Sequence, residues 1–112
     1  MKKVEDKSIT GHPINTFETL NRRLIVYKGK YKLVKVGITG RNPQARFNEH
    51  LKYNGDWQRM IVIYKTKSTR YANNMEYWLV DKHKNDLINT REGGGSWLSE
   101  SVPHYYVYLL LA

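Results

Sequence analysis

The feature that most constrains the fold is an unbroken apolar run, Met60-Ile61-Val62-Ile63-Tyr64. β-Branched and aromatic residues favour a strand, and a strand without polar alternation needs cover on both of its faces. We therefore expect a central strand here, or one covered on both sides. The segment 105–111 is also too continuously apolar for an exposed edge strand, so we expect it to lie between layers or to pair with a second copy of the chain.

One helix is predicted before this central strand in the sequence, and another is predicted after it. Asn42-Pro43 indicates the start of the first helix, since Asn is a good N-cap and Pro suits the first helical position. This helix should end near residue 53. Ser68 or Thr69 should cap the second helix, which should continue to about residue 84.

The segment before residue 40 predicts a hairpin. Leu24-Ile25-Val26-Tyr27 is rich in strand-forming residues, and a turn at 28–30 would connect it to a second strand within 31–39. Residues 1–21 are predicted to form an N-terminal arm with a short helix capped by Asn15, and residues 22–112 the main domain. The expected order is β-β-α-β-α-β, an α/β (α+β) fold with a small, mainly antiparallel sheet of three or four strands flanked by helices.

Composition narrows the class of protein. A chain of 112 residues corresponds to one domain. The chain has no cysteine, which excludes disulfides, thiolate zinc sites and thiol catalysis. It has neither an apolar run long enough to span a membrane nor an apolar segment behind the basic N-terminus that would make a secretory signal. We therefore expect a cytoplasmic protein, host- or phage-encoded, that does not bind membranes.

The net charge of the chain indicates which class of partner it binds. With 19 Lys+Arg against 10 Asp+Glu the net charge is +9, and no acid occurs between residues 21 and 48 or between 57 and 75. A compact basic surface of this kind favours a polyanion, with nucleic acid first. The candidate DNA-contacting residues are the basic side chains of these stretches: Arg22, Arg23, Lys28, Lys30, Lys32, Arg41 and Arg70.

Three polar residues have positions that core building alone does not require. Arg46 and His50 are four residues apart, and so share one face of the first predicted helix. Glu76 falls at the edge of the buried stripe of the second helix, beside Leu79 and Ala72. A half-shielded carboxylate of this kind is typical of a metal ligand or of a buried ion pair.

The order of these residues resembles that of the GIY-YIG nuclease family over about residues 22–97. Tyr27 stands where the first motif of the family ends, with Tyr31 as the alternative, because the spacer to the second motif is short. Lys35-Val36-Gly37 stands for the second motif, as in the small, phage-type branch that has Lys in its first position. Arg46 with His50 and then Glu76 resemble the family's helical residues, and Asn89 with the glycines from Gly93 resembles its closing segment.

The resemblance implies a divalent-metal-dependent DNA endonuclease. Glu76 would hold one Mg²⁺ or Mn²⁺ per active site, and Arg46 would clamp a phosphate oxygen. Tyr27 would activate or orient the attacking water, and Lys35 would lower the pKa of that tyrosine or contact the phosphate. His50 would hydrogen-bond the tyrosine or shuttle a proton, while Gly37 and Asn89 would have structural roles.

The sequence leaves alternatives open. One active site and no separate recognition domain imply nicking of one strand at a time, or double-strand cutting by a homodimer, in a phage, mobile-element or other setting. The missing second tyrosine of the family pattern instead favours a non-catalytic DNA- or RNA-binding module on the same scaffold. A third hypothesis is a structural or interaction protein that dimerises through its last strand.

Overall fold

The computed structural model describes residues 2–88 and 102–112. Strands and helices alternate along this part of the chain. The strands are β1 (Glu5–Ile9), β2 (Val34–Thr39), β3 (Arg59–Thr66) and β4 (Tyr105–Leu111), and the helices are α1 (Pro13–Lys30), α2 (Pro43–Tyr53) and α3 (Thr69–His83).

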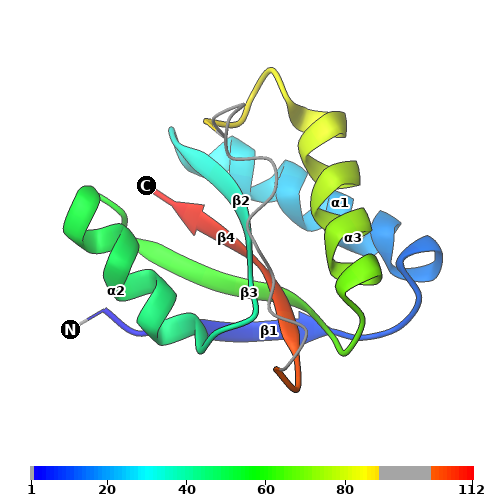
Figure 1. Ribbon diagram of the computed structural model, residues 1–112. Coiled ribbons are helices and arrows are strands. Elements are labelled where there is room, and N and C mark those ends of the chain that lie inside the picture. The colour runs from blue at the N-terminus through cyan, green and yellow to red at the C-terminus, as the bar shows by residue number, and fades with distance from the viewer. Residues whose placement is uncertain (1, 89–101) are drawn as a thin grey trace.

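The strands form one mixed sheet in the order β1-β3-β4-β2 (Figure 1). β4 runs antiparallel to both of its neighbours, whereas β1 runs parallel to β3. The predicted α+β class, with a small, mainly antiparallel sheet flanked by helices, is confirmed.

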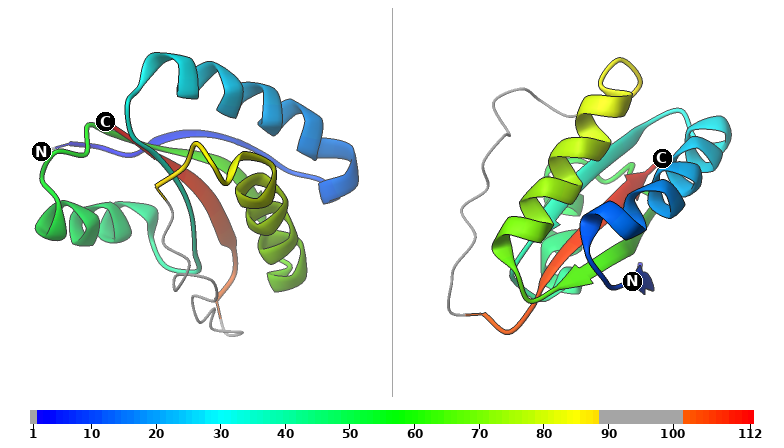
Figure 2. Two further views of the ribbon diagram at one scale, coloured as in Figure 1. Left: turned by 90° about the horizontal axis from the view of Figure 1, so that it is seen from above. Right: turned by 90° about the vertical axis from the view of Figure 1, so that its right-hand side faces the viewer.

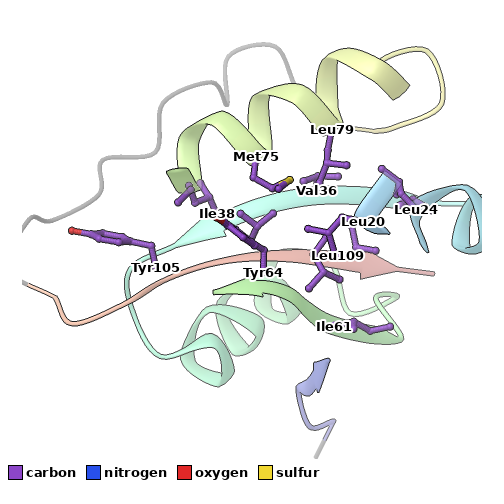
Figure 3. Close-up of a cluster of buried hydrophobic side chains, with 14 of the residues drawn as sticks. Leu20, Leu24, Val36, Ile38, Ile61, Tyr64, Met75, Leu79, Tyr105 and Leu109 are labelled. Atoms are coloured by element: carbon purple, nitrogen blue, oxygen red, sulfur yellow. The ribbon is translucent and has the colours of Figure 1, made fainter. Parts of the chain in front are cut away.

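Helices cover both faces of the sheet. α1 and α3 lie side by side on one face and α2 lies on the other (Figure 2). The larger core cluster packs below α1 and α3 and includes Leu20, Met75 and Leu109 (Figure 3). A second cluster, which includes Phe47 and Trp57, packs below α2. Residues 60–64 are almost completely buried within β3, as their lack of polar alternation predicts.

The last strand is an interior strand. β4 spans the predicted residues and is hydrogen-bonded to β3 on one side and to β2 on the other. It therefore lies between layers, the first of the two predicted possibilities. Because both of its edges are occupied, β4 has no free edge with which to form the alternative, a homodimer through this strand.

The first predicted strand is wrong, and with it the hairpin. Residues 24–27 belong to α1, which continues to Lys30. The buried side chains of α1 recur every three or four residues from Pro13 to Leu24, so that burying this stripe on the sheet outweighs the weak strand preference of Ile25 and Val26. These two side chains are each 52% exposed.

The first 21 residues contribute to the sheet as well as to a helix. Glu5 in β1 pairs with Ile61 in the ladder, and its carboxylate forms an ion pair with Arg59 at 2.6 Å. α1 crosses the expected boundary at residue 22 without a break, and its N-cap is His12 rather than Asn15. The segment expected as an arm therefore provides an edge strand and the first half of a packed helix.

A buried polar contact joins α1 and α3. His83 Nε2 lies 2.5 Å from Asn21 Oδ1, and both side chains are buried. Because the amide oxygen can only accept, Nε2 carries the proton and donates it. Burial, with a smaller effect of Lys28, lowers the pKa of His83.

This lowered pKa predicts acid sensitivity of the α1–α3 contact. Unfolding restores the ordinary affinity of His83 for a proton, so the unfolded state binds more protons once the pH falls below about 6.5. We expect His83→Gln, which can still donate to Asn21, to lose less stability than the wild type between pH 7 and pH 5. Urea unfolding at both pH values measures this, and equal losses would contradict it.

Candidate active site

Four predicted site residues come together around the outer edge of β2, the last strand in the sheet order. Lys35 lies on β2, Arg46 and His50 on α2, and Glu76 on α3. The charges of Arg46 and Glu76 both act on Lys35, and those of Arg46 and Lys35 both act on His50. Because α2 and α3 cover opposite faces of the sheet, the site wraps around the edge of β2.

Gly37 lets a tyrosine of β4 reach this edge. Gly37 and Tyr108 are cross-strand partners. A Cβ at position 37 would lie 2.3 Å from Tyr108 Cζ and 2.4 Å from its hydroxyl oxygen. The phenol ring therefore crosses over β2 where a side chain is missing, and the structural role expected for Gly37 is to make room for it.

The hydroxyl of Tyr108 lies among the predicted site residues. It is 2.8 Å from His50 Nε2, and it interacts with the guanidinium group of Arg46, which raises the pKa of Arg46 against the effect of burial. Glu76 also acts on it electrostatically. Sequence reasoning missed Tyr108 because it lies in an apolar run that indicates core. The available signal was Gly37, a strand glycine that indicates close approach by another group.

The predicted position of Tyr27 on a strand beside Lys35 is wrong. Tyr27 lies on α1, where its ring contacts the guanidinium group of Arg59 at 5.8 Å and the ring of Tyr31 at 6.4 Å. The alternative, Tyr31, accepts a hydrogen bond of 2.8 Å from Arg59 Nη1. Both tyrosines thus belong to a cluster at the start of β3, and the tyrosine that contacts Arg46 and His50 is Tyr108.

A second carboxylate, Glu49, holds the arginines of this region. Its oxygens accept from Arg41 at 2.9 and 2.5 Å and from Arg46 Nη1 at 3.0 Å. These hydrogen bonds lower the pKa of Glu49 to about 2. Glu49 therefore holds the guanidinium group of Arg46, a planar group of the kind that recognises phosphate. The sequence analysis did not single out Glu49.

The environment shifts the protonation of the site residues. Burial raises the pKa of Glu76 to about 7, against a smaller opposite effect of Lys35. Burial, followed by repulsion from Arg46, lowers the pKa of Lys35 and brings that of His50 to about 4. His50 is therefore neutral at pH 7, and Glu76 exchanges its proton near that pH.

Glu76 is suited to a cation that needs few protein ligands. Within residues 2–88 and 102–112, no three His, Asp or Glu side chains are grouped as a metal cluster. Mg²⁺ is compatible with this donor set, because it keeps several waters and often binds through one or two carboxylates. A cation beside Glu76 would also favour its ionised form, which burial disfavours.

The candidate DNA-contacting residues are distributed over two faces. Arg22, Arg23, Lys28 and Lys30 lie on α1 and Arg70 on α3, whereas Arg41 precedes α2, and Lys32 lies in the loop after α1. Three of them have partners: Arg41 pairs with Glu49 at 2.5 Å, Arg23 donates to the carbonyl of Lys7 at 2.7 Å, and Lys28 pairs with Asp86 at 2.7 Å. The predicted hairpin, which would have carried Lys28, Lys30 and Lys32, does not form. Asn89 and the glycines from Gly93 lie outside the described residues.

Comparisons with known proteins identify no relative of this chain. No protein-family model matches the chain, and searches of curated proteins and of solved structures give no match either. In the described part of the chain, none of the helices has the length and apolar character needed to cross a membrane.

Gly37→Ala tests the close approach of Tyr108. We expect a loss of about 1–3 kcal/mol in the free energy of unfolding, because the added methyl group overlaps the phenol ring. Gly29→Ala is the matched control: a Cβ there meets no atom within 4 Å, and alanine should stabilise α1 by about 0.5–1 kcal/mol. Urea unfolding measures both, and a neutral Gly37→Ala would contradict the packing.

Glu76→Gln tests the burial of the carboxylate. Between pH 4.5 and about 7 the folded protein binds more protons at Glu76 than the unfolded chain does, so this group costs stability as the pH rises through that range. At pH 8 we expect Glu76→Gln to be about 1–3 kcal/mol more stable than the wild type, and this advantage to shrink at pH 5. Glu18→Gln, on the exposed side of α1, should show no such pH-dependent gain.

Proposed function

We propose that this chain is a metal-dependent DNA endonuclease that nicks one strand at the edge of β2. The observation that carries the proposal is the hydroxyl of Tyr108, which lies 2.8 Å from His50 Nε2 and within electrostatic reach of Arg46 and of the half-buried Glu76. A carboxylate, a fixed guanidinium group and a phenol–imidazole pair are a suitable set for phosphodiester hydrolysis. The net charge of +9 supports a nucleic acid as the substrate.

Each residue has a role that follows from its contacts. Arg46, held by Glu49, binds a non-bridging phosphate oxygen, and Lys35 adds positive charge beside it. The neutral imidazole of His50 accepts from the Tyr108 hydroxyl, which in turn can accept a proton from the attacking water. Burial raises the pKa of Tyr108, so the phenol acts as a neutral relay. Glu76 would hold one Mg²⁺ or Mn²⁺, and such a cation would supply positive charge to neutralise the phosphate and the leaving oxygen.

The position of Tyr108 also supports the GIY-YIG resemblance in a changed chain order. In the expected arrangement a tyrosine on the strand before Lys35-Val36-Gly37 faces Arg46 and His50. Here the antiparallel neighbour of β2 is β4, which comes later in the chain, and it provides the tyrosine opposite Gly37. We infer that β4 replaces the expected first strand.

One observation favours the non-catalytic DNA- or RNA-binding module. Lys35 interacts electrostatically with Glu76, so this carboxylate has a partner other than a metal ion. If that pairing is its whole role, the same edge binds phosphates through Arg46 without cutting.

A nicking assay separates the two functions and the two tyrosines. Supercoiled plasmid at pH 8 with Mg²⁺ or Mn²⁺ should be nicked by the wild type, and at least 100-fold more slowly by Glu76→Gln, which still binds DNA. Tyr108→Phe should lose most of the rate, because it removes the hydroxyl and keeps the ring. Tyr27→Phe is the matched control and should nick at the wild-type rate.

Two outcomes would contradict these assignments. A wild-type protein that shifts the plasmid on a gel but leaves it intact from pH 6 to pH 9 with both metals would favour the binding module. Loss of nicking in Tyr27→Phe with full activity in Tyr108→Phe would overturn the role of Tyr108. Circular dichroism of each variant confirms that it is folded.

A further inference from the structure

A second concave site lies at the carboxyl ends of the parallel strands β1 and β3. It is a cavity of about 480 Å³, and the residues that matter for its chemistry are His12, Lys65, Lys67, Tyr71 and His104. β1 and β3 are on the side of the sheet away from β2, so this cavity is distinct from the site around Tyr108. Its volume is within the range typical of small-molecule sites and is larger than a lone phosphate requires.

One side of the cavity is aromatic. The rings of His12 and Tyr71 contact each other with centroids 4.7 Å apart and an interplanar angle of 55°. His12 Nδ1 accepts a hydrogen bond of 3.2 Å from the backbone N–H of Ile14, which fixes the imidazole at the start of α1. Aromatic rings held in this way suit the face of a nucleobase.

Two lysines and a histidine also line the cavity, and the ammonium group of Lys65 lies 6.0 Å from the ring centroid of Tyr106. Lys65 and Lys67 are two residues apart at the end of β3, and both act on His104, whose pKa is lowered by burial and then by these two lysines. No carboxylate is among the described residues that line the cavity. The acid that does interact with Lys65 is Asp6, whose principal partner is Ser8.

We propose that this cavity binds a nucleoside monophosphate unit, with its base against Tyr71 and His12 and its phosphate on Lys65 and Lys67. The combination of aromatic and cationic residues around one cavity carries the proposal, because each kind of residue matches one half of that ligand. The unit can be a free nucleotide or the 5′-phosphorylated end of a strand. The proposal does not depend on nuclease activity.

Isothermal titration calorimetry on the full chain tests the ligand. The probes are dAMP, the 5′-phosphorylated dinucleotide pTpT, deoxyadenosine and inorganic phosphate. We expect dAMP to bind at least tenfold more tightly than deoxyadenosine or phosphate alone. Binding of pTpT as well identifies strand ends as a source of the ligand, and binding of dAMP alone identifies the free nucleotide.

Variants locate the binding. Lys65→Gln with Lys67→Gln should weaken dAMP binding at least tenfold, whereas the matched pair Lys82→Gln with Lys84→Gln, at the other end of α3, should not change it. Proton NMR gives a second readout: bound phosphate should raise the pKa of His104, since an anion favours the imidazolium form.

Three results would overturn the proposal. These are unchanged dAMP binding in the Lys65/Lys67 variant, equal affinity for phosphate and dAMP, and an unaltered His104 pKa in the presence of saturating dAMP. Glu76→Gln should bind dAMP like the wild type. Nucleotide binding in a protein that does not nick would therefore defeat the proposed function alone, and nicking without nucleotide binding would defeat this proposal alone.

Discussion

The close contact between Tyr108 and Gly37 is the constraint on which the candidate site depends. Because Gly37 has no side chain, the ring of Tyr108 on β4 can pass over β2. Its hydroxyl group therefore reaches the outer edge of β2. Arg46 and His50 reach this hydroxyl from one face of the sheet, and Glu76 acts on it from a helix on the other face. Without the glycine, the phenol ring could not cross β2, and Arg46, His50 and Glu76 would surround only the outer surface of that strand.

The charges around that hydroxyl oppose folding. Burial, and then repulsion by neighbouring positive charges, lowers the pKa of Lys35 and of His50, and the half-buried Glu76 holds its proton up to about pH 7. Such groups lower the stability of the folded protein, and strongly shifted pKa values of this kind cluster at functional sites. In contrast, Glu49 forms ion pairs with both Arg41 and Arg46, and these pairs hold the guanidinium groups in place.

Local signals predicted much of the structure. Asn42 and Ser68 cap their helices by direct side-chain hydrogen bonds, and the spacing of Arg46 and His50 places both beside Tyr108 because helix geometry leaves no alternative. The segment 24–27 was wrongly predicted as a strand. The strand preference of its residues is weak compared with the burial of a continuous stripe of side chains along a helix. Tyr108 was out of reach for another reason: its partner Gly37 is 71 positions earlier, and nothing local indicates which strands pair across such a distance.

The place of β4 in the sheet has a consequence for how the protein folds. β2 and β3 are made before β4, and within the described residues the sheet connects them only through β4, so the sheet cannot close around its centre until residues 105–111 have been synthesised. Pairings of such long sequence separation are slow to form, and until then the inner edges of β2 and β3 lack their hydrogen-bonding partner. Because the same strand brings in Tyr108, a chain still on the ribosome without β4 has neither a closed core nor an assembled site, and both arise in a single late step.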